Sequence, residues 1–404
     1  MTRRRGLLAG LLAACLLATA CSGGTQRAEP AASSPGHGAH SHGAHDGPTS
    51  SPSAPTSGPT AAPAGLRSGE RRVRLTMPTP YTPSAPYGTG TDDYRCFVLD
   101  PGLDTDAFVT GLDIRPGTPS EVHHVILFRL PPDAVAAAEA KDAADQGEGW
   151  TCFGATGLET PGAGLDDAPW LGAWAPGGHE QVLADDVGVP LQKGSRIVMQ
   201  VHYNLLAGAK PDTSATELRI APGTASLDPL ETMLMPAPVE LPCRAGHDGG
   251  RLCDRDAAVA DVQRRFGDDV GQTANYLHLL CGNAPAGPVQ TCDRTVPSAA
   301  TVRAAAGHMH LLGRSIRIEL NPGTDRARTL LDVPTWNFDD QAARPVDPVR
   351  LEKGDTVRVT CRHDQHLRDL LPSFDGPRRA DRYVVWGEGS TDEMCLGILL
   401  VTRR

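Results

Sequence analysis

The sequence predicts an all-β protein with two jelly-roll-like antiparallel β-sandwich domains in tandem, preceded by a signal peptide and a disordered linker. Three observations predict this fold class. The chain has 404 residues, which is more than a single core usually organises. Aromatic residues make up 4% of it, whereas glycine (44) and proline (35) are abundant, as in short strands joined by turns. Several short segments alternate apolar and polar residues between turn signals.

The first residues indicate export. The stretch "MTRRRGLLAGLLAACLLATAC" has a basic start, an apolar segment and small residues before Cys21. "LATAC" resembles a bacterial lipobox, so we expect residues 1–20 to be a lipoprotein signal peptide. A lipid on Cys21 would then hold the protein on the extracytoplasmic face of the cell membrane. Ordinary signal cleavage nearby is the alternative, and export by the Sec or the twin-arginine route stays open.

Residues 21–80 are the expected disordered linker, because Ala, Ser, Pro, Gly and Thr dominate a stretch that has little apolar surface to bury. The linker contains "HGAHSHGAHDG". Its four histidines are His37, His40, His42 and His45. Such a tract binds copper or zinc loosely, and a solvated linker without a defined role fits the composition as well.

The expected domains comprise residues 81–222 and 223–404. Alternating residues predict strands at 107–116, 195–205, 308–320 and 355–361. In the second of these strands, Val198, Gln200 and His202 share one face. Only one helix is expected, at 133–147.

Two histidine motifs stand out. His308 and His310 of "GHMHLLG" point the same way if they lie in a strand, so both can bind one metal ion. His123 and His124 of "VHHVILF" are adjacent, and adjacent strand residues face opposite sides. They can share an ion only at a strand end or bulge, or through different ring nitrogens. An isolated His-x-His is a weak signal for a metal site.

Four motifs together are more specific: "VHHVILF", "VMQVHYN", "GHMHLLG" and "STDEMC" occur in this order. They resemble the copper type II, ascorbate-dependent monooxygenases, the family of the peptidylglycine α-hydroxylating and dopamine β-monooxygenases. The resemblance covers roughly residues 90–204 and 300–400. It implies hydroxylation of a C–H bond of a small molecule with O₂, and ascorbate or another reductant as co-substrate.

The resemblance also implies two copper ions per chain, in two separate centres. The electron-donating centre would be formed by His123, His124 and His202. The oxygen-binding, catalytic centre would be formed by His308, His310 and Met394. The chemistry is suitable, because imidazole binds copper in both oxidation states and a thioether favours Cu(I).

Eight cysteines remain after Cys15 and Cys21 are set aside, and an even number in an exported chain predicts disulfides. The family resemblance implies that Cys96 pairs with Cys152 and that Cys361 pairs with Cys395. The other four are expected to form two disulfides whose pairing stays open. They are Cys243, Cys253, Cys281 and Cys292.

The substrate anchors of the peptide-processing members are missing. Their arginine two residues before His-x-His corresponds to Ala306, and their Asn and Tyr after the Met-adjacent Cys correspond to Leu396 and Ile398. Tyr94 alone keeps its counterpart and is a weak candidate substrate contact. Loss of the guanidinium removes a contact worth about 2–3 kcal/mol to a carboxylate. We therefore expect a neutral or apolar small-molecule substrate.

Two other functions were weighed. A non-catalytic copper-binding or delivery lipoprotein would fit the histidine tract and the missing anchors, whereas a zinc hydrolase lacks a water-activating Glu at recognisable spacing. The net charge of −10 argues against nucleic acid as main partner, and a monomer is expected. The remaining histidines are expected to be surface or satisfied residues. They are His179, His247, His278, His363 and His366. "CRHDQH" is expected to be a polar loop, and metal binding by its two histidines is the alternative.

Overall fold

The computed structural model describes residues 64–86, 90–158 and 167–403. The expected signal peptide, the lipidation site Cys21 and the histidine tract lie outside these residues. Within them, no helix has the length and apolar character needed to span a membrane.

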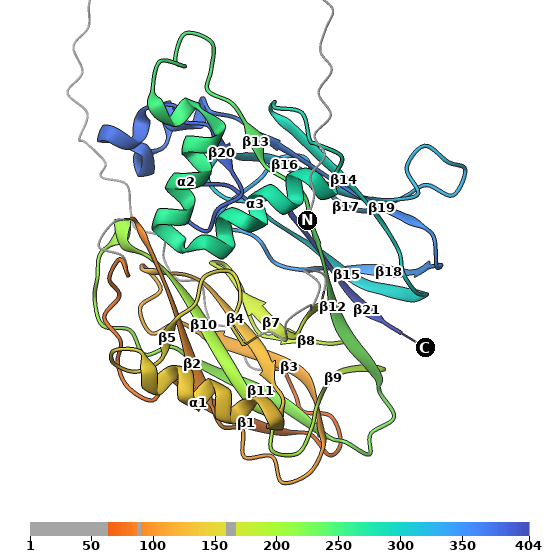
Figure 1. Ribbon diagram of the computed structural model, residues 1–404. Coiled ribbons are helices and arrows are strands. Elements are labelled where there is room, and N and C mark those ends of the chain that lie inside the picture. Colours follow the sequence, from red (N-terminus) through yellow and green to blue (C-terminus); the bar gives the residue numbers. More distant parts are fainter. Residues whose placement is uncertain (1–63, 87–89, 159–166, 404) are drawn as a thin grey trace, which may run out of the picture. The chain divides into compact units, whose positions relative to one another are not determined.

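The first half of the described chain is a β-sandwich, the lower part of Figure 1. One layer is a five-stranded sheet of order β5-β2-β10-β4-β7, and β1, β11, β3 and β9 form the other layer. Both layers contribute to one apolar core, which includes Leu75, Val109, Leu127 and Met199. The strands are β1 Arg71–Thr76, β2 Asp92–Leu99, β3 Ala107–Arg115, β4 Val122–Leu130, β5 Trp150–Thr151, β6 Asp167–Ala168, β7 Trp170–Trp174, β8 Gln181–Val182, β9 Val187–Leu191, β10 Arg196–Asn204 and β11 Ala215–Pro222.

Strand β10 shows how the sequence pattern sets the layers. Met199 and Tyr203 enter the core between the sheets, whereas Val198 packs on the outer side beneath α1 Val135–Ala144. Gln200 and His202 share the face of Val198, as predicted from the period-two alternation. That outer face carries the histidine cluster described below.

The second half forms another sandwich. A four-stranded sheet of order β14-β19-β16-β17 packs against β12, β21, β15 and β18. These last four strands continue the ten-stranded sheet that also contains β1, β11, β3 and β9. The elements are β12 Asp228–Pro236, β13 Glu240–Leu241, β14 Val289–Thr295, β15 Ala300–His308, β16 Gly313–Leu320, β17 Arg328–Val333, β18 Arg344–Leu351, β19 Thr356–His363, α4 Leu367–Leu370, β20 Val384–Val385 and β21 Leu396–Thr402.

One sheet therefore runs through both sandwiches. β12 pairs with β21 in antiparallel fashion and with β9 in parallel. The mostly-β sandwich architecture is as predicted. The expected domain boundary at residue 222 falls at the end of β11, immediately before the strand that joins the two halves.

The expected linker was too long. It was predicted to reach residue 80, but Arg71–Thr76 forms β1, and each of its residues is paired in register with β11. The alternation of "RRVRLT" explains the strand, because it turns Leu75 into the core while the arginines stay at the surface.

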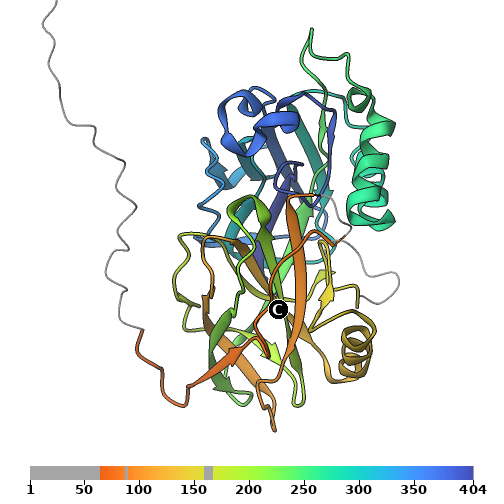
Figure 2. The same cartoon turned by 90° about the vertical axis from the view of Figure 1, so that its left-hand side faces the viewer.

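The helices were predicted in part. A 3₁₀ turn at Pro132–Ala134 and α1 confirm the helix expected at 133–147. The helices α2 Arg255–Phe266 and α3 Asp268–Leu280 were not predicted. The Asp254 carboxylate caps α2 by accepting from the Ala257 amide at 2.9 Å, and Gly267, at φ 95°, links the two helices. Figure 2 shows both helices against the second sandwich.

These two helices cover the face of β15 and β21 near the candidate site. Phe266 packs in one cluster with Met394 and Leu396. Arg265 donates to both carboxylate oxygens of Asp392, at 2.6 and 2.7 Å. The helical pair was missed because charged residues dominate α2 and leave only a narrow apolar stripe.

Four disulfides join the eight cysteines. The structure confirms the two disulfides Cys96–Cys152 and Cys361–Cys395. The four cysteines whose pairing the sequence left open bond to their nearest cysteine along the chain. These bonds are Cys243–Cys253 and Cys281–Cys292.

Removal of the Cys361–Cys395 bond by a double substitution to alanine should lower the free energy of unfolding by about 4 kcal/mol, because the bond closes a loop of 34 residues. The same change at Cys281 and Cys292, which closes 11 residues, should cost about 3 kcal/mol and is the matched control. Urea unfolding followed by circular dichroism measures both. Wild-type stability of the first double variant would contradict the expectation.

Candidate metal centre

Three buried histidines converge on the outer face of the first sandwich. Their Nδ1 atoms lie 3.1 Å apart between His123 and His202, 3.2 Å between His123 and His124, and 3.3 Å between His124 and His202. All three side chains are at most 8% exposed. Each offers one nitrogen to the same point, so the trio has the form of a metal site.

A strand irregularity explains how adjacent histidines come together. His202 is paired with His124, but the next residue, Tyr203, is paired with Val122, so His123 is left without a partner on β10. This β-bulge at the start of β4 turns both rings to one side. The sequence had predicted that His123 and His124 could share an ion only at a strand end or bulge or through different ring nitrogens, and the structure contains a bulge there.

Neighbouring groups fix the orientation of His202. Its Nε2 lies 2.9 Å from Asp92 Oδ1, and because a carboxylate only accepts, Nε2 carries the proton. The lone pair is therefore on Nδ1, where the other two histidines meet. The Tyr94 ring stacks on a face of the His202 imidazole, and the two ring centroids lie 4.0 Å apart. A carboxylate behind a histidine is the usual support for a metal-ligating imidazole.

The residues fit a metal ion. Two nitrogens bound at about 2.0 Å with a tetrahedral angle between them lie about 3.3 Å apart, close to the observed spacings. Burial, with the neighbouring imidazoles, lowers the pKa of His123 and of His124 well below the usual value, so both rings are neutral and able to act as ligands. Three convergent nitrogens cannot all be satisfied by hydrogen bonds to one another, whereas one cation satisfies them all.

Substitution of Asp92 by Asn should weaken metal binding at the trio about 10–100-fold, because the amide no longer fixes the His202 tautomer. Metal titration of the purified chain measures the change. Asp93→Asn is the matched control, since Asp93 is equally buried but accepts from Tyr81 and Ser84. Equal affinities of the Asp92→Asn variant and the wild type would rule out this supporting role.

The second histidine pair comes together in a different local structure from the one predicted. The expected strand at 308–320 is wrong, because β15 ends at His308, a turn follows, and β16 begins at Gly313. The turn folds His310 back so that its Nε2 lies 3.3 Å from His308 Nε2. The prediction that the two rings face one point holds for this different reason.

The donor set at this pair also suits a metal. Gln341 Nε2 donates to Phe338 O, so Gln341 Oε1 faces His308 and accepts from its Nδ1 at 2.6 Å. His308 Nε2 is thereby left with its lone pair toward His310. Burial lowers the pKa of His308 to about 3 and also lowers that of His310. His310 Nδ1 is buried without a hydrogen-bond partner among the described residues.

Glu393 ties Met394 to this pair. One oxygen of its buried carboxylate, Oε2, accepts from the backbone amides of His310 at 3.0 Å and Met394 at 3.1 Å. Met394 is 6% exposed and packs with α2 and α3. The backbone of the predicted sulfur ligand is thus anchored beside the second histidine of the pair.

His363 was misjudged from the sequence. "CRHDQH" was expected to be a polar loop, but His363 is the last residue of β19 and is 2% exposed. Its Nε2 lies 3.3 Å from Met394 O and 3.4 Å from Glu393 Oε2. His366 is exposed and bonds Asp364, as expected. The strand extends two residues past Cys361, which turns His363 inward behind the Met394 segment.

The two histidine sets are neighbours. The rings of His124 and His308 meet edge to face, with centroids 5.5 Å apart. The family resemblance had implied separate centres in separate domains. The two sets do come from different sandwiches, and β4 and β10 of one lie beside the end of β15 of the other.

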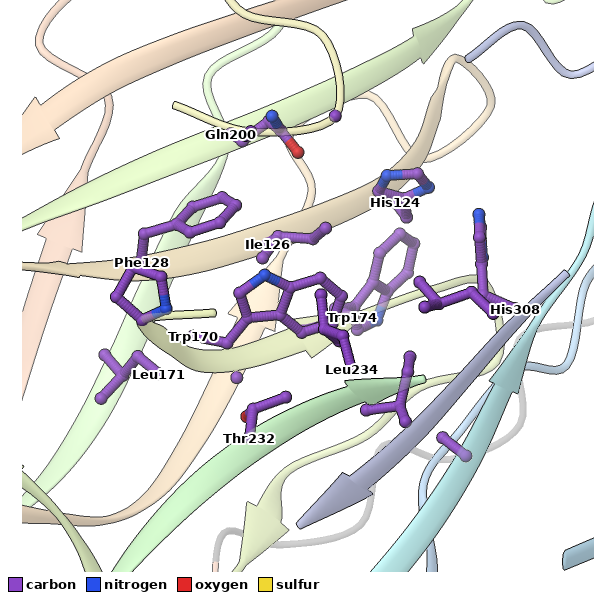
Figure 3. Close-up of a pocket in the computed structure, with 18 of the residues that line it drawn as sticks. His124, Ile126, Phe128, Trp170, Leu171, Trp174, Gln200, Thr232, Leu234 and His308 are labelled. Carbon is purple, nitrogen blue, oxygen red and sulfur yellow. The ribbon is translucent and has the colours of Figure 1, made fainter. Parts of the chain in front are cut away.

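An apolar cavity of about 580 Å³ reaches both sets. Figure 3 shows His124 and His308 at one end of it and Trp170 and Trp174 along its wall. The three positions at which the resemblance implies lost substrate anchors line it with apolar side chains. They are Ala306, Leu396 and Ile398.

Tyr94, the weak candidate substrate contact, lines this cavity too. Its hydroxyl donates to Glu388 O at 2.9 Å, and its ring covers His202. Its clearest role is therefore to hold the trio, with the ring edge left for a bound molecule.

Several supporting residues were not found from the sequence: Asp92, Gln341, Glu388 and Glu393. Asp92 stands two residues before Tyr94 in "DDYRC", and Glu393 precedes Met394, so proximity to a motif was the only available signal. Gln341 lies in a loop 31 residues after His310, and no pattern pointed to it.

Comparison with known proteins identifies no family. No family model matches the chain, and no curated protein matches it. Among solved structures, the chain is similar to the major capsid protein P2 of bacteriophage PM2, with a TM-score of 0.29, 11% identity, and 82% of this chain and 97% of that chain covered. A Paenibacillus xanthan lyase gives a TM-score of 0.19 and 12% identity over 82% of this chain and 25% of that one. Neither likeness bears on function.

Proposed function

We propose that this protein is a copper-dependent monooxygenase that hydroxylates a C–H bond of a neutral, largely apolar small molecule. The observation that carries the proposal is the cavity, which is lined by one imidazole from each histidine set, His124 and His308. A site that only stores metal needs no apolar chamber of about 580 Å³ beside its ligands. The proposal includes export and a lipid anchor on Cys21.

Each histidine set would bind one copper ion. His123, His124 and His202 would hold one copper ion, and His308, His310 and Met394 a second one in a softer donor set. Bound copper would supply the redox chemistry that activates O₂ with electrons from ascorbate or a similar reductant. Asp92 accepts from His202 Nε2, and Gln341 accepts from His308 Nδ1. The other nitrogen of each ring therefore stays unprotonated and faces the metal. The apolar walls exclude water and position the substrate.

Ascorbate-driven oxygen uptake tests the proposal. The purified chain, loaded with two equivalents of copper, is assayed against a panel of neutral apolar compounds, and products are analysed by mass spectrometry. Uptake that is stimulated by a compound and yields its hydroxylated product is expected. Two bound coppers without substrate-stimulated uptake across the panel would overturn the enzyme proposal.

That second outcome would favour a copper-delivery lipoprotein. The histidine-rich stretch of residues 37–45 in the sequence supports this alternative, because such a tract can collect copper ions. Transfer of copper from the loaded chain to a chelator of matched affinity would then be faster in the full chain than in a variant with those four histidines replaced by serine.

A further inference from the structure

We infer that the cavity accepts a molecule with an apolar body and one hydroxyl or N–H group, and that Gln200 Oε1 accepts the hydrogen bond of that group. The inference names the substrate class of the proposed function and rests on the same cavity. It concerns recognition, so it is tested without copper.

The orientation of the Gln200 amide is fixed. Its Nε2 donates to the carbonyl oxygen of Cys152 at 3.0 Å, so Oε1 must point the other way. The Cys96–Cys152 disulfide holds that carbonyl, and Cys96 is paired with Gln200 across β2 and β10. The acceptor is therefore held in place before any ligand binds.

Gln200 Oε1 is buried and has no hydrogen-bond partner among the described residues. The residue is 1% exposed and lines the cavity. Figure 3 shows the oxygen end of its side chain directed into the cavity, near Ile126 and His124. A buried acceptor left unpaired is unfavourable, and such an atom beside a cavity is explained by a ligand that donates to it.

A second polar group lies at the same end. The Glu388 carboxyl packs against Gly154, two residues after Cys152: a Cβ on that glycine would be 2.9 Å from Glu388 Oε1. Gly154 has φ 68°, a left-handed backbone conformation that favours glycine, and a larger residue there would also collide with Glu388. Burial raises the pKa of Glu388 to about 8, against the opposing effect of the Trp386 indole. The group is mostly a neutral acid at pH 7, able to donate to a hydroxyl oxygen.

This arrangement favours a neutral ligand. A hydroxyl group can donate to Gln200 Oε1, whereas a carboxylate would meet the unpaired Gln200 oxygen and be repelled. Much of the wall is aromatic or aliphatic, including Phe128, Trp170 and Leu234.

Isothermal titration calorimetry on the full chain without added metal tests the inference. The probes are 4-phenyl-1-butanol, its methyl ether, which accepts but cannot donate, and butylbenzene. The alcohol should bind about tenfold more tightly than the ether, the effect of one net hydrogen bond to a buried acceptor. Equal or weaker binding of the alcohol, or no binding of any probe, would overturn the inference.

Two variants locate the acceptor. Gln200→Met has a similar length and no amide, so it should bind the alcohol and the ether equally and keep its affinity for butylbenzene, which shows an intact cavity. Thr232→Val removes another buried polar group of the wall and should retain the alcohol preference. Persistence of the preference in Gln200→Met, or its loss in Thr232→Val, would assign the contact elsewhere. Because no copper or oxygen is used, the result is independent of the oxygen-uptake assay.

Discussion

Replacing His202 by Ala should reduce the copper content from two ions to one per chain. The His202 Nδ1 atom is one of three that meet within 3.3 Å, and the other two cannot hold an ion as tightly. Loss of a supporting residue behind a ligand already costs about 10–100-fold in affinity, so loss of the ligand should cost more than about 100-fold. Competition with a Cu(I)-selective chelator measures the affinity, and metal analysis gives the stoichiometry.

The structure also sets the controls for this substitution. Asp92 loses its hydrogen bond to His202 and keeps those from Thr91 and Ser390. Loss of a hydrogen bond to a buried carboxylate should lower the stability by about 1.5–3 kcal/mol, so thermal melts must show that the variant is folded at the assay temperature. His366→Ala removes an exposed histidine that bonds only Asp364 among the described residues. It should leave both ions in place. Two tightly bound ions in the His202→Ala variant would contradict the assignment of the trio.

Replacing Met394 by Leu should abolish substrate-stimulated oxygen uptake while the trio still binds copper. Leucine has nearly the volume of methionine, so the packing against α2 and α3 should change by less than about 1.5 kcal/mol. What the substitution removes is the thioether, the soft donor that favours Cu(I) beside His308 and His310. Oxygen-electrode assays and Cu(I) competition titrations of the same preparation measure both consequences.

A control variant separates the effect of losing the sulfur ligand from the effect of replacing a buried methionine by leucine. Met235 is 3% exposed, packs in the core of the second sandwich and is not one of the proposed ligands. Met235→Leu makes the same chemical change and should keep wild-type uptake. If Met394→Leu also kept it, Met394 would have no part in the chemistry, and the pair His308 and His310 would need another third ligand.

The sequence predicted the local geometry of the trio because strand alternation is a strong signal. The period-two pattern of β10 placed Gln200 and His202 on one face. For the adjacent His123 and His124 the sequence left open a strand end, a bulge or different ring nitrogens, and the structure contains a bulge. Four disulfides followed from cysteine number, and the two pairs implied by the family resemblance are both present.

Other features depend on contacts between distant residues, and these leave no local pattern. The alternation after His308 suggested a continuous strand, but the Glu393 carboxylate accepts from the amides of His310 and Leu312 and stabilises a turn instead. His363 was expected in a loop because the polar residues around it gave no sign that β19 continues to this position. The contact between His124 of β4 and His308 of β15 joins two different sandwiches, and no pattern in either strand predicts it.

The sheet that joins the two halves has a mechanical consequence. Separating the sandwiches would require rupture of the backbone hydrogen bonds that β12 makes with β9, so the halves cannot swing apart as bodies on a free hinge. Reactants must then reach the chamber without a hinge opening between the halves. Heat should disrupt both halves together, and a calorimetric scan of the chain should show a single endotherm for residues 64–403.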